Sequence, residues 1–166
     1  LSETRLEEGR MNLNISVELV DDVIQEALRH VDRKKDEHTI TVEHEDELLL
    51  ARMDSRLIVQ MVINLVDNAI KYTNTGGITI KLCSYELFAC VEVTDTGIGI
   101  GEEEHAAVFG RFYRGNAVAE KSGVGIGLYL ARFIMQQQGG YIRLSSTPGA
   151  GSTFGLYFPT AIVSKL

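Results

Sequence analysis

The sequence of 166 residues contains no tryptophan, only two prolines and two cysteines, and no long uninterrupted run of apolar residues. Two cysteines, Cys83 and Cys90, are too few for the disulfide framework of a small secreted protein, and no histidine or cysteine has zinc-site spacing. No stretch approaches the roughly 18 to 20 apolar residues that are needed to cross a bilayer. We therefore expect a folded domain in which both cysteines are small buried thiols in a reducing compartment.

Positive charge is also scarce, because 16 Lys and Arg residues face 23 Asp and Glu residues, for a net charge of -7. A broad contact with a nucleic-acid backbone needs a basic face, so we expect no nucleic-acid partner. A small anionic ligand stays possible, since helix N-termini and a metal ion can bind one locally. The charged start, Leu1 to Glu8, is not a signal peptide, and we read the chain as a piece of a longer protein.

Apolar residues recur at helical spacing in some segments and alternate in others, within a length that suits one domain. Helices are predicted over 18–34, 54–72 and 128–138, and strands over 12–17, 39–44, 48–51, 77–85, 87–94, 141–145 and 151–158. Taken alone, this mixture indicates an α/β or α+β domain.

The helix predicted over 54–72 has an apolar side and an opposite polar side. Its core side contains Ile58, Val62, Val66, Ala69 and Ile70, and its polar side contains Asn64, Asp67, Asn68, Lys71 and Tyr72. A polar side is most often simply exposed to solvent. Asparagine, however, is a weak helix former, so two of them four residues apart need another explanation. Asparagine oxygens suit Mg²⁺, and Lys71 is a point charge suited to phosphate.

Glycine is abundant and unevenly placed, with 13 of the 16 glycines between Gly97 and Gly155. Asp95-Thr96-Gly97-Ile98-Gly99 follows an expected strand, and Gly123-Val124-Gly125-Ile126-Gly127 precedes an expected helix. Alternate glycines let the backbone approach a ligand, and a helix N-terminus presents free N–H groups to phosphate. Neither segment is a Walker loop or a dinucleotide fingerprint. Together they nevertheless indicate a phosphate-containing ligand.

Between these two segments, Val108 to Gly115 contains an aromatic cluster and two arginines, Arg111 and Arg114. One interpretation is a small satellite core. The other is a lid whose arginines lie near the phosphates, because long loops of this kind often close over ligands.

Four segments resemble the sequence boxes of sensor histidine kinases, in the order and spacing of that family. They are the N box at Asn64–Thr73, the G1 box at Asp95–Ile100, the F box at Phe109–Arg114 and the G2 box at Gly123–Leu128. The resemblance implies their C-terminal catalytic and ATP-binding domain, within the GHKL superfamily. The fold it implies is α+β, a two-layer sandwich of the Bergerat type with a mixed, mostly antiparallel sheet on three helices and a flexible lid. Residues 1–11 would then end the dimerisation region or form a linker, and residues 12–166 would form the catalytic domain.

The same resemblance implies ATP and Mg²⁺ as ligands and a role for each matched residue. Asn68 is expected to coordinate Mg²⁺, with Asn64 close by and Lys71 on phosphate. Asp95 is expected to accept a hydrogen bond from the adenine amino group, because a carboxylate accepts only and would reject a guanine carbonyl. Arg111 or Arg114 is expected to neutralise charge as the γ-phosphoryl group leaves. The remaining nucleotide-binding residues implied are Tyr72, Gly97, Gly99, Ile100, Phe112, Gly123, Gly125, Gly127 and Leu128.

The activity implied is that of a protein histidine kinase, a transferase of two-component signal transduction. In this family the phosphorylated histidine lies in a separate dimerisation domain, before an acidic and then a basic residue. His30, His38, His44 and His105 do not stand in that setting, and we read each as a surface histidine. The fragment is therefore expected to bind ATP without phosphorylating itself. The partners implied are its own dimerisation domain and a response regulator, in a homodimeric, membrane-anchored protein whose catalytic domain is cytoplasmic.

Two alternatives stay open, a regulator that binds ATP without transfer and a related ATPase. In the related ATPases a glutamate base stands four residues before the Mg²⁺ asparagine, where this chain has Asn64. An amide cannot take a proton from water, whereas an imidazole nucleophile needs no such base, which favours the histidine kinase. Gly101 and Gly110 replace residues common in the family and are expected to loosen the lid. Gln138 replaces a frequent histidine, with no expected effect on chemistry.

Overall fold

The computed structural model describes residues 12–31, 38–45, 48–71, 73, 76–101, 103 and 124–160. The strands are β1 (Ser16–Leu19), β2 (His38–His44), β3 (Leu50–Met53), β4 (Gly76–Tyr85), β5 (Phe88–Asp95), β6 (Tyr141–Thr147) and β7 (Gly151–Pro159). The helices are α2 (Val20–Arg29), α3 (Ser55–Lys71) and α4 (Val124–Gln137). No helix among these residues is long and apolar enough to span a membrane.

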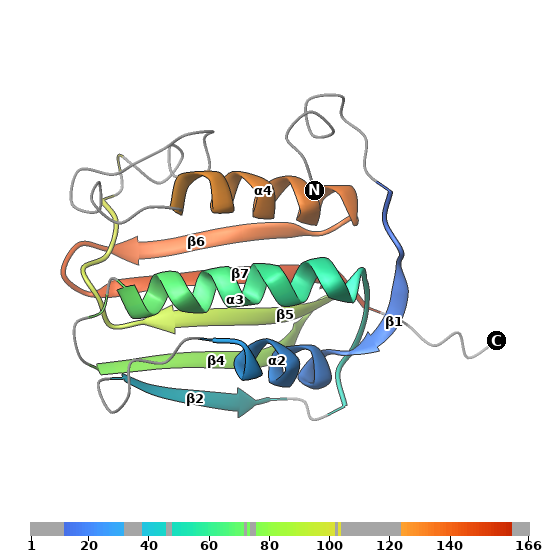
Figure 1. Cartoon of the computed structure of the whole chain (residues 1–166), viewed down its shortest axis with the longest axis horizontal. Coiled ribbons are helices and arrows are strands. Elements are labelled where there is room, and N and C mark those ends of the chain that lie inside the picture. Colours follow the sequence, from blue (N-terminus) through green and yellow to red (C-terminus); the bar gives the residue numbers. More distant parts are fainter. Residues whose placement is uncertain are drawn as a thin grey trace.

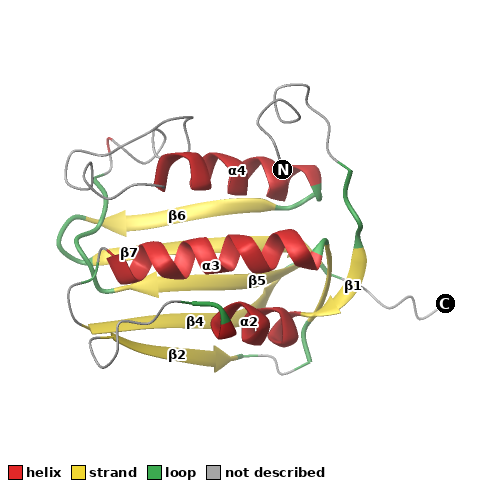
Figure 2. Cartoon of the chain, in the orientation of Figure 1, coloured by secondary structure: helices red, strands yellow, loops and turns green. Residues whose placement is uncertain are grey.

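The strands form a five-stranded sheet in the order β2-β4-β5-β7-β6, and β1 pairs with β3 in a separate two-stranded sheet. Only β2 and β4 are parallel neighbours in the large sheet, since the other pairs are antiparallel. The strands β4 and β5 form an antiparallel hairpin, with Glu86 at φ 54 in its turn. The three helices cover one face of the sheet (Figures 1 and 2). The expected two-layer architecture is confirmed.

The core lies between this sheet face and the helices. Alternate residues of β4, Ile78, Ile80 and Leu82, have no exposed surface, as the period of a strand with one covered face requires. Burial of each such side chain contributes about 1.5–3 kcal/mol. The predicted core side of the long helix is also confirmed. Its buried residues are Ile58, Met61, Val62, Leu65, Val66, Ala69 and Ile70.

The two cysteines lie on the other side of the sheet, directly opposite each other on β4 and β5. Cys83 and Cys90 are free thiols, and with Tyr157 they form a small second cluster. The ring of Tyr157 stacks on that of Tyr141 at a centroid distance of 4.5 Å. Burial raises the pKa of both thiols, that of Cys90 to about 12. Both are therefore buried thiols, as expected, with little thiolate near neutral pH.

Several predicted boundaries are wrong. The strands predicted over 48–51 and 141–145 span Leu50–Met53 and Tyr141–Thr147, and the first helix begins at Val20 rather than 18. The first strand spans Ser16–Leu19 rather than 12–17, because its pairing with β3 fixes which residues it includes. The first helix ends at Arg29 rather than 34, since the N–H groups of His30 and Val31 bond to carbonyls only three residues back. The last helix begins at Val124 rather than at Leu128. The predicted tail at 1–11 lies outside the described residues.

Candidate nucleotide-binding site

Several predicted site segments meet at one end of the sheet. The C-terminal end of α3, the N-terminal end of α4, the loop after β5 and the turn between β6 and β7 lie on the same side, at the left of Figure 1. The helices α3 and α4 contact each other and run in opposite directions (Figure 1). The fold thereby brings the polar end of α3 near the loop after Asp95 and the first turn of α4.

On α3, the predicted polar side is accessible. Asn64 and Lys71 are exposed, and Asn68 is partly exposed, while their apolar neighbours are buried. Lys71 is the last residue of the helix, where a cation interacts favourably with the helix dipole. A hard cation that also binds phosphates needs few protein ligands, and the Asn68 amide oxygen fits that requirement. Within the described ranges, no group of three or more acidic, histidine or cysteine side chains could bind a metal.

Asp95 is the last residue of β5, and it is 9% exposed. Its Oδ1 accepts hydrogen bonds from the backbone N–H groups of Gly97, at 2.8 Å, and Ser152, at 3.3 Å. Burial raises the pKa of Asp95, and these two bonds act in the opposite direction. Both donors bind the same oxygen, so the carboxylate has a fixed orientation. Both bonds use Oδ1, and within the described part of the chain Oδ2 accepts no hydrogen bond.

The loop after Asp95 rests on the turn between β6 and β7. Gly149 donates its N–H to the Ile98 carbonyl at 2.7 Å, and Ile100 donates its N–H to the Ser146 Oγ at 2.6 Å. Gly99 has φ +76, and a Cβ there would lie 2.1 Å from the Thr147 carbonyl oxygen. Glycine is therefore required at position 99 because the backbone of Thr147 leaves no room for a side chain. From the sequence alone, this glycine was expected to allow the close approach of the backbone to a ligand.

Three residues that position this loop were not identified from the sequence. They are Ser146, Gly151 and Ser152. Gly151 has φ +92, and a Cβ there would lie 2.0 Å from the Asp95 carbonyl oxygen. The Ser146 hydroxyl lies 2.8 Å from the Ser152 hydroxyl and donates to the Gly151 carbonyl at 3.0 Å. The available signal was a third Gly-x-Gly, Gly149-Ala150-Gly151, directly followed by a hydroxyl residue.

The start of α4 differs from the sequence prediction in a way that affects the phosphate site. Gly125 and Gly127 lie inside the first turn of the helix rather than in a preceding loop. The first N–H groups of an α-helix have no partner within the helix, and here these include the N–H groups of residues 124–126. Leu128 comes after them, and its side chain is buried in the core. The glycine-containing turn thus places N–H groups that have no partner within the helix, and the positive end of the helix dipole, at the shared end of the sheet.

Several predicted site residues lie outside the described residues, including most of the expected lid. They are Tyr72, Phe109, Gly110, Arg111, Phe112, Arg114, Gly115 and Gly123.

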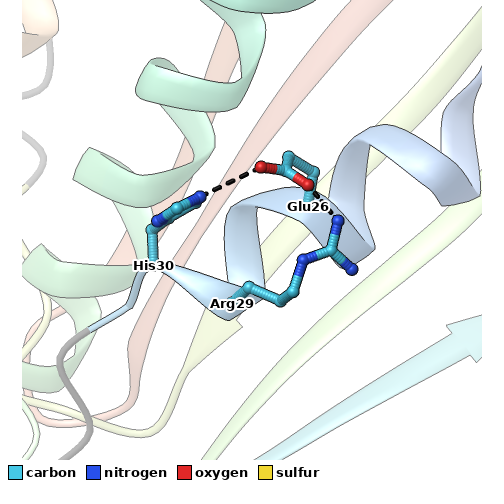
Figure 3. Close-up of polar contacts among 3 residues, drawn as sticks. All are labelled: Glu26, Arg29 and His30. Atoms are coloured by element: carbon cyan, nitrogen blue, oxygen red, sulfur yellow. Dashed lines mark hydrogen bonds and ion pairs between the residues drawn. The ribbon is translucent and has the colours of Figure 1, made fainter.

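Each histidine within the described residues has a polar partner. His30 is 58% exposed, and its Nε2 lies 3.0 Å from the Glu26 carboxylate, which also pairs with Arg29 (Figure 3). The hydrogen bond from His30 and, to a smaller extent, that from Arg29 lower the pKa of Glu26. His44 lies 2.7 Å from Asp21. His38 is partly buried and bonds to the Thr73 carbonyl, so its interpretation as a surface histidine is wrong.

Residues 53–162 match the sequence profile of the histidine kinase-, DNA gyrase B- and HSP90-like ATPases. The chain belongs to this family. It is 33% identical over 162 residues to the sensor protein KdpD of Clostridium acetobutylicum, a match that covers 96% of the chain and 18% of KdpD. It is 42% identical over 108 residues to the adaptive-response sensory kinase SasA of Crocosphaera subtropica, covering 64% of the chain and 28% of SasA. The chain thus spans less than a third of the length of these relatives.

Solved structures show the same architecture. The nucleotide-free catalytic domain of histidine kinase ThkA superposes with a TM-score of 0.77 at 26% identity, over 89% of this chain and 98% of that domain. Full-length ShkA, in complex with AMPPNP, superposes with a TM-score of 0.78 at 22% identity, over 91% of this chain and 32% of ShkA. The resemblance to sensor histidine kinases and the expected fold are confirmed. The chain is an ATP-binding catalytic domain of the sensor histidine kinase type.

Proposed function

We propose that this chain binds Mg²⁺-ATP and transfers its γ-phosphoryl group to a histidine on a dimerisation domain of the same protein, for relay to a response regulator. The observation that supports the proposal most is the meeting of three features at one end of the sheet. These features are a fixed carboxylate at Asp95, an amide-bearing helix end at Asn64 to Lys71, and the first turn of α4 (Figure 1).

At the base end, Asp95 is proposed to bind adenine. Its Oδ1 is occupied by two backbone N–H donors, so Oδ2 is the oxygen that accepts from the adenine amino group. Gly97, Gly99 and Ile100 form the loop beside the base, and the turn between β6 and β7 holds that loop in place. A guanine carbonyl at the same place would face a carboxylate oxygen, which is unfavourable.

At the phosphate end, the two helices are proposed to bind the triphosphate from opposite sides. Asn68 would hold the Mg²⁺ ion, Asn64 would lie toward the phosphates, and Lys71 would contact phosphate. The ion would neutralise charge on the bridged phosphate oxygens. The N–H groups of the first turn of α4, including Gly125 and Gly127, add a positive dipole. Tyr72, Phe112, Gly123 and one of Arg111 and Arg114 are proposed to complete the site.

In the proposed reaction, a ring nitrogen of the acceptor histidine attacks the γ-phosphorus. A P–N bond forms, the bond to the bridging oxygen breaks, and ADP leaves with the bond electrons. Such transfer depends mainly on positioning and charge neutralisation, which agrees with a site that has an amide at Asn64 and not a carboxylate. A response regulator as partner, a cytoplasmic location and a homodimeric, membrane-anchored full protein belong to the same proposal.

The binding claim is tested by calorimetric titration of the chain with ATP, with and without Mg²⁺. Asn68→Ala should abolish the Mg²⁺-dependent part of the affinity, because it removes the proposed ligand oxygen. Gln60→Ala is the matched control, since it deletes an exposed amide from the same helix. Equal Mg²⁺-ATP affinity in all three proteins would contradict the role of Asn68.

The transfer claim is tested by mixing the chain with Mg²⁺-ATP and a dimerisation domain that contains the acceptor histidine. Acid-labile phosphate on that histidine is the expected result. Binding without transfer would favour a nucleotide-sensing regulator, and release of inorganic phosphate alone would favour an ATPase.

A further inference from the structure

A polar cluster around the buried Asp54 joins the ends of α3 and α4 that lie away from the proposed nucleotide site. Asp54, which is 1% exposed, donates its N–H to the Gln138 Oε1 at 2.7 Å. The Asp54 Oδ2 accepts from the backbone N–H of Asn14 at 2.9 Å. We call Asn14, Asp54 and Gln138 the Asp54 cluster. It connects residues 40 and 84 positions apart in the sequence.

Both polar ends of the Gln138 amide are used. While its oxygen accepts from Asp54, its Nε2 donates to the Ile134 carbonyl at 3.3 Å, one turn back along α4. The N–H groups of Gly139 and Gly140 bond to the last turn of α4, and Gly139 has φ +82. The helix end is therefore well defined, and the Gln138 side chain extends from it to the start of α3.

The cluster and the proposed phosphate site lie at opposite ends of the same two helices. The helix α3 begins beside Asp54 and runs to Lys71, whereas α4 begins in the glycine turn and ends beside Gln138 (Figure 1). Asn68 is 14 residues from Asp54, which is about 21 Å along a helix. The relative placement of the two helices at the cluster thus determines the spacing between Asn68 and the first turn of α4.

Apolar packing between the helices acts through many weak contacts, and the hydrophobic effect itself has no preferred direction. A hydrogen bond from the start of one helix to the end of the other is directional and fixes how far the helices slide. Small displacements are sufficient to matter, because a misplacement of about 1 Å at a reacting centre can cost about 100-fold in rate.

We propose that Gln138 is a positioning residue for the triphosphate, acting through Asp54 on the relative placement of α3 and α4. The inference rests on the proposed function, since it needs the triphosphate to lie between these helices. It agrees with the expectation that glutamine in place of a frequent histidine leaves the chemistry unchanged, because both side chains offer an acceptor and a donor. The base end is held by different contacts, those of Asp95, Ser146 and Gly149, and does not depend on Gln138.

The test compares affinities for Mg²⁺-ATP and adenosine, well below the unfolding temperature of each protein. Gln138→Met keeps the size of the side chain and removes its hydrogen bonds. It should weaken Mg²⁺-ATP binding by about fivefold or more, the usual lower range for coupled sites, while adenosine binding stays unchanged. Gln138→His should restore affinity, because a neutral imidazole keeps one acceptor and one donor. Gln137→Met, which changes an exposed glutamine of the same helix, should have no effect.

A measurement on the unmodified chain gives the same information without a variant. Because coupling is reciprocal, Mg²⁺-ATP should slow hydrogen exchange of the Asp54 amide by a factor similar to the affinity loss, and adenosine should not. An equal loss of adenosine and Mg²⁺-ATP affinity in Gln138→Met, or no loss of either, would overturn the inference. So would an unchanged Asp54 exchange rate. Failure of the unmodified chain to bind Mg²⁺-ATP would instead overturn the proposed function, and this inference with it.

Discussion

Gly99 offers a sharp test of how the proposed adenine loop is held. It has φ +76, and a Cβ at this position would lie 2.1 Å from the Thr147 carbonyl oxygen and 2.7 Å from the carbonyl carbon. Both neighbours are backbone atoms of the turn between β6 and β7, so a side chain cannot rotate to relieve the contact. Gly99→Ala must therefore separate the loop from the turn or shift both.

The cost has two parts. An alanine in left-handed backbone conformation costs about 1–2 kcal/mol. Separation of the loop from the turn also weakens the bond between the Gly149 N–H and the Ile98 carbonyl, at about 0.5–1.5 kcal/mol. We expect Gly99→Ala to lower the free energy of unfolding by about 1.5–3.5 kcal/mol, which is about 3–14 °C in melting temperature for a chain of this length. Mg²⁺-ATP affinity should fall at least about tenfold, because the displaced loop no longer lies beside the base.

Two other glycines separate these contributions. Gly149 has φ +82 with nothing near its absent Cβ, so Gly149→Ala should show the backbone cost alone. Gly77 has neither a positive φ nor a near neighbour, and Gly77→Ala should change stability by less than about 0.5 kcal/mol. Urea unfolding and calorimetric titration of the three variants provide the measurements. A Gly99→Ala protein as stable as Gly149→Ala would refute the steric argument, and unchanged nucleotide affinity would refute the placement of the base.

Two further predictions concern the same end of the sheet. Asp95→Asn should weaken ATP binding by about 10- to 100-fold, because the Gly97 and Ser152 N–H groups hold the amide oxygen and leave the NH₂ group facing the adenine amino group. Since burial raises the pKa of Asp95 above 3.8, lowering the pH should protonate it early and weaken ATP binding in the unmodified chain, but not in Asp95→Asn. Protonation of Asp95 also stabilises the folded state, because its pKa is higher there than in the unfolded chain. This contribution to the free energy of unfolding is fully present below pH 3.8 and is lost as the pH rises through the folded-state pKa, which unfolding measured as a function of pH would reveal. Ser146→Ala should lower the free energy of unfolding by about 1–3 kcal/mol, because it removes the oxygen that accepts the Ile100 N–H. Ser145→Ala, which changes an exposed serine of the same strand, is the control. Equal unfolding midpoints for the two variants would contradict the role of Ser146.

The sequence was most informative where a long periodic pattern and a specific chemistry coincided. The helix α3 was predicted within one residue at each end, because its 17 residues alternate between apolar and polar sides over several turns. The strand β5 was predicted within one residue at each end, whereas the acceptor role expected of its last residue, Asp95, comes from the resemblance to the sensor histidine kinases. The element boundaries depend on local periodicity, which a single sequence contains.

Other features depend on contacts between distant segments, and no local pattern shows them. The start of α4 was placed four residues too late, because glycine is a poor helix former and hides the first turn. The Ser146 hydroxyl accepts a hydrogen bond from the N–H of Ile100, which is 46 positions away in the sequence, and Gln138 and Asp54 are 84 positions apart. Such pairs form only once the sheet order and the helix layer are in place. The residues that position the site were therefore found in the structure, whereas those expected to contact the ligand were found in the sequence.

The proposed function depends most on adenine recognition by a carboxylate that only accepts hydrogen bonds. Calorimetric titration of the chain with ATP and, separately, with GTP, both with Mg²⁺, tests this directly. We predict saturable binding of one ATP per chain and an affinity for GTP at least about tenfold lower, because the guanine carbonyl would face the Asp95 Oδ2. Equal affinities for the two nucleotides, or no binding of ATP, would contradict it.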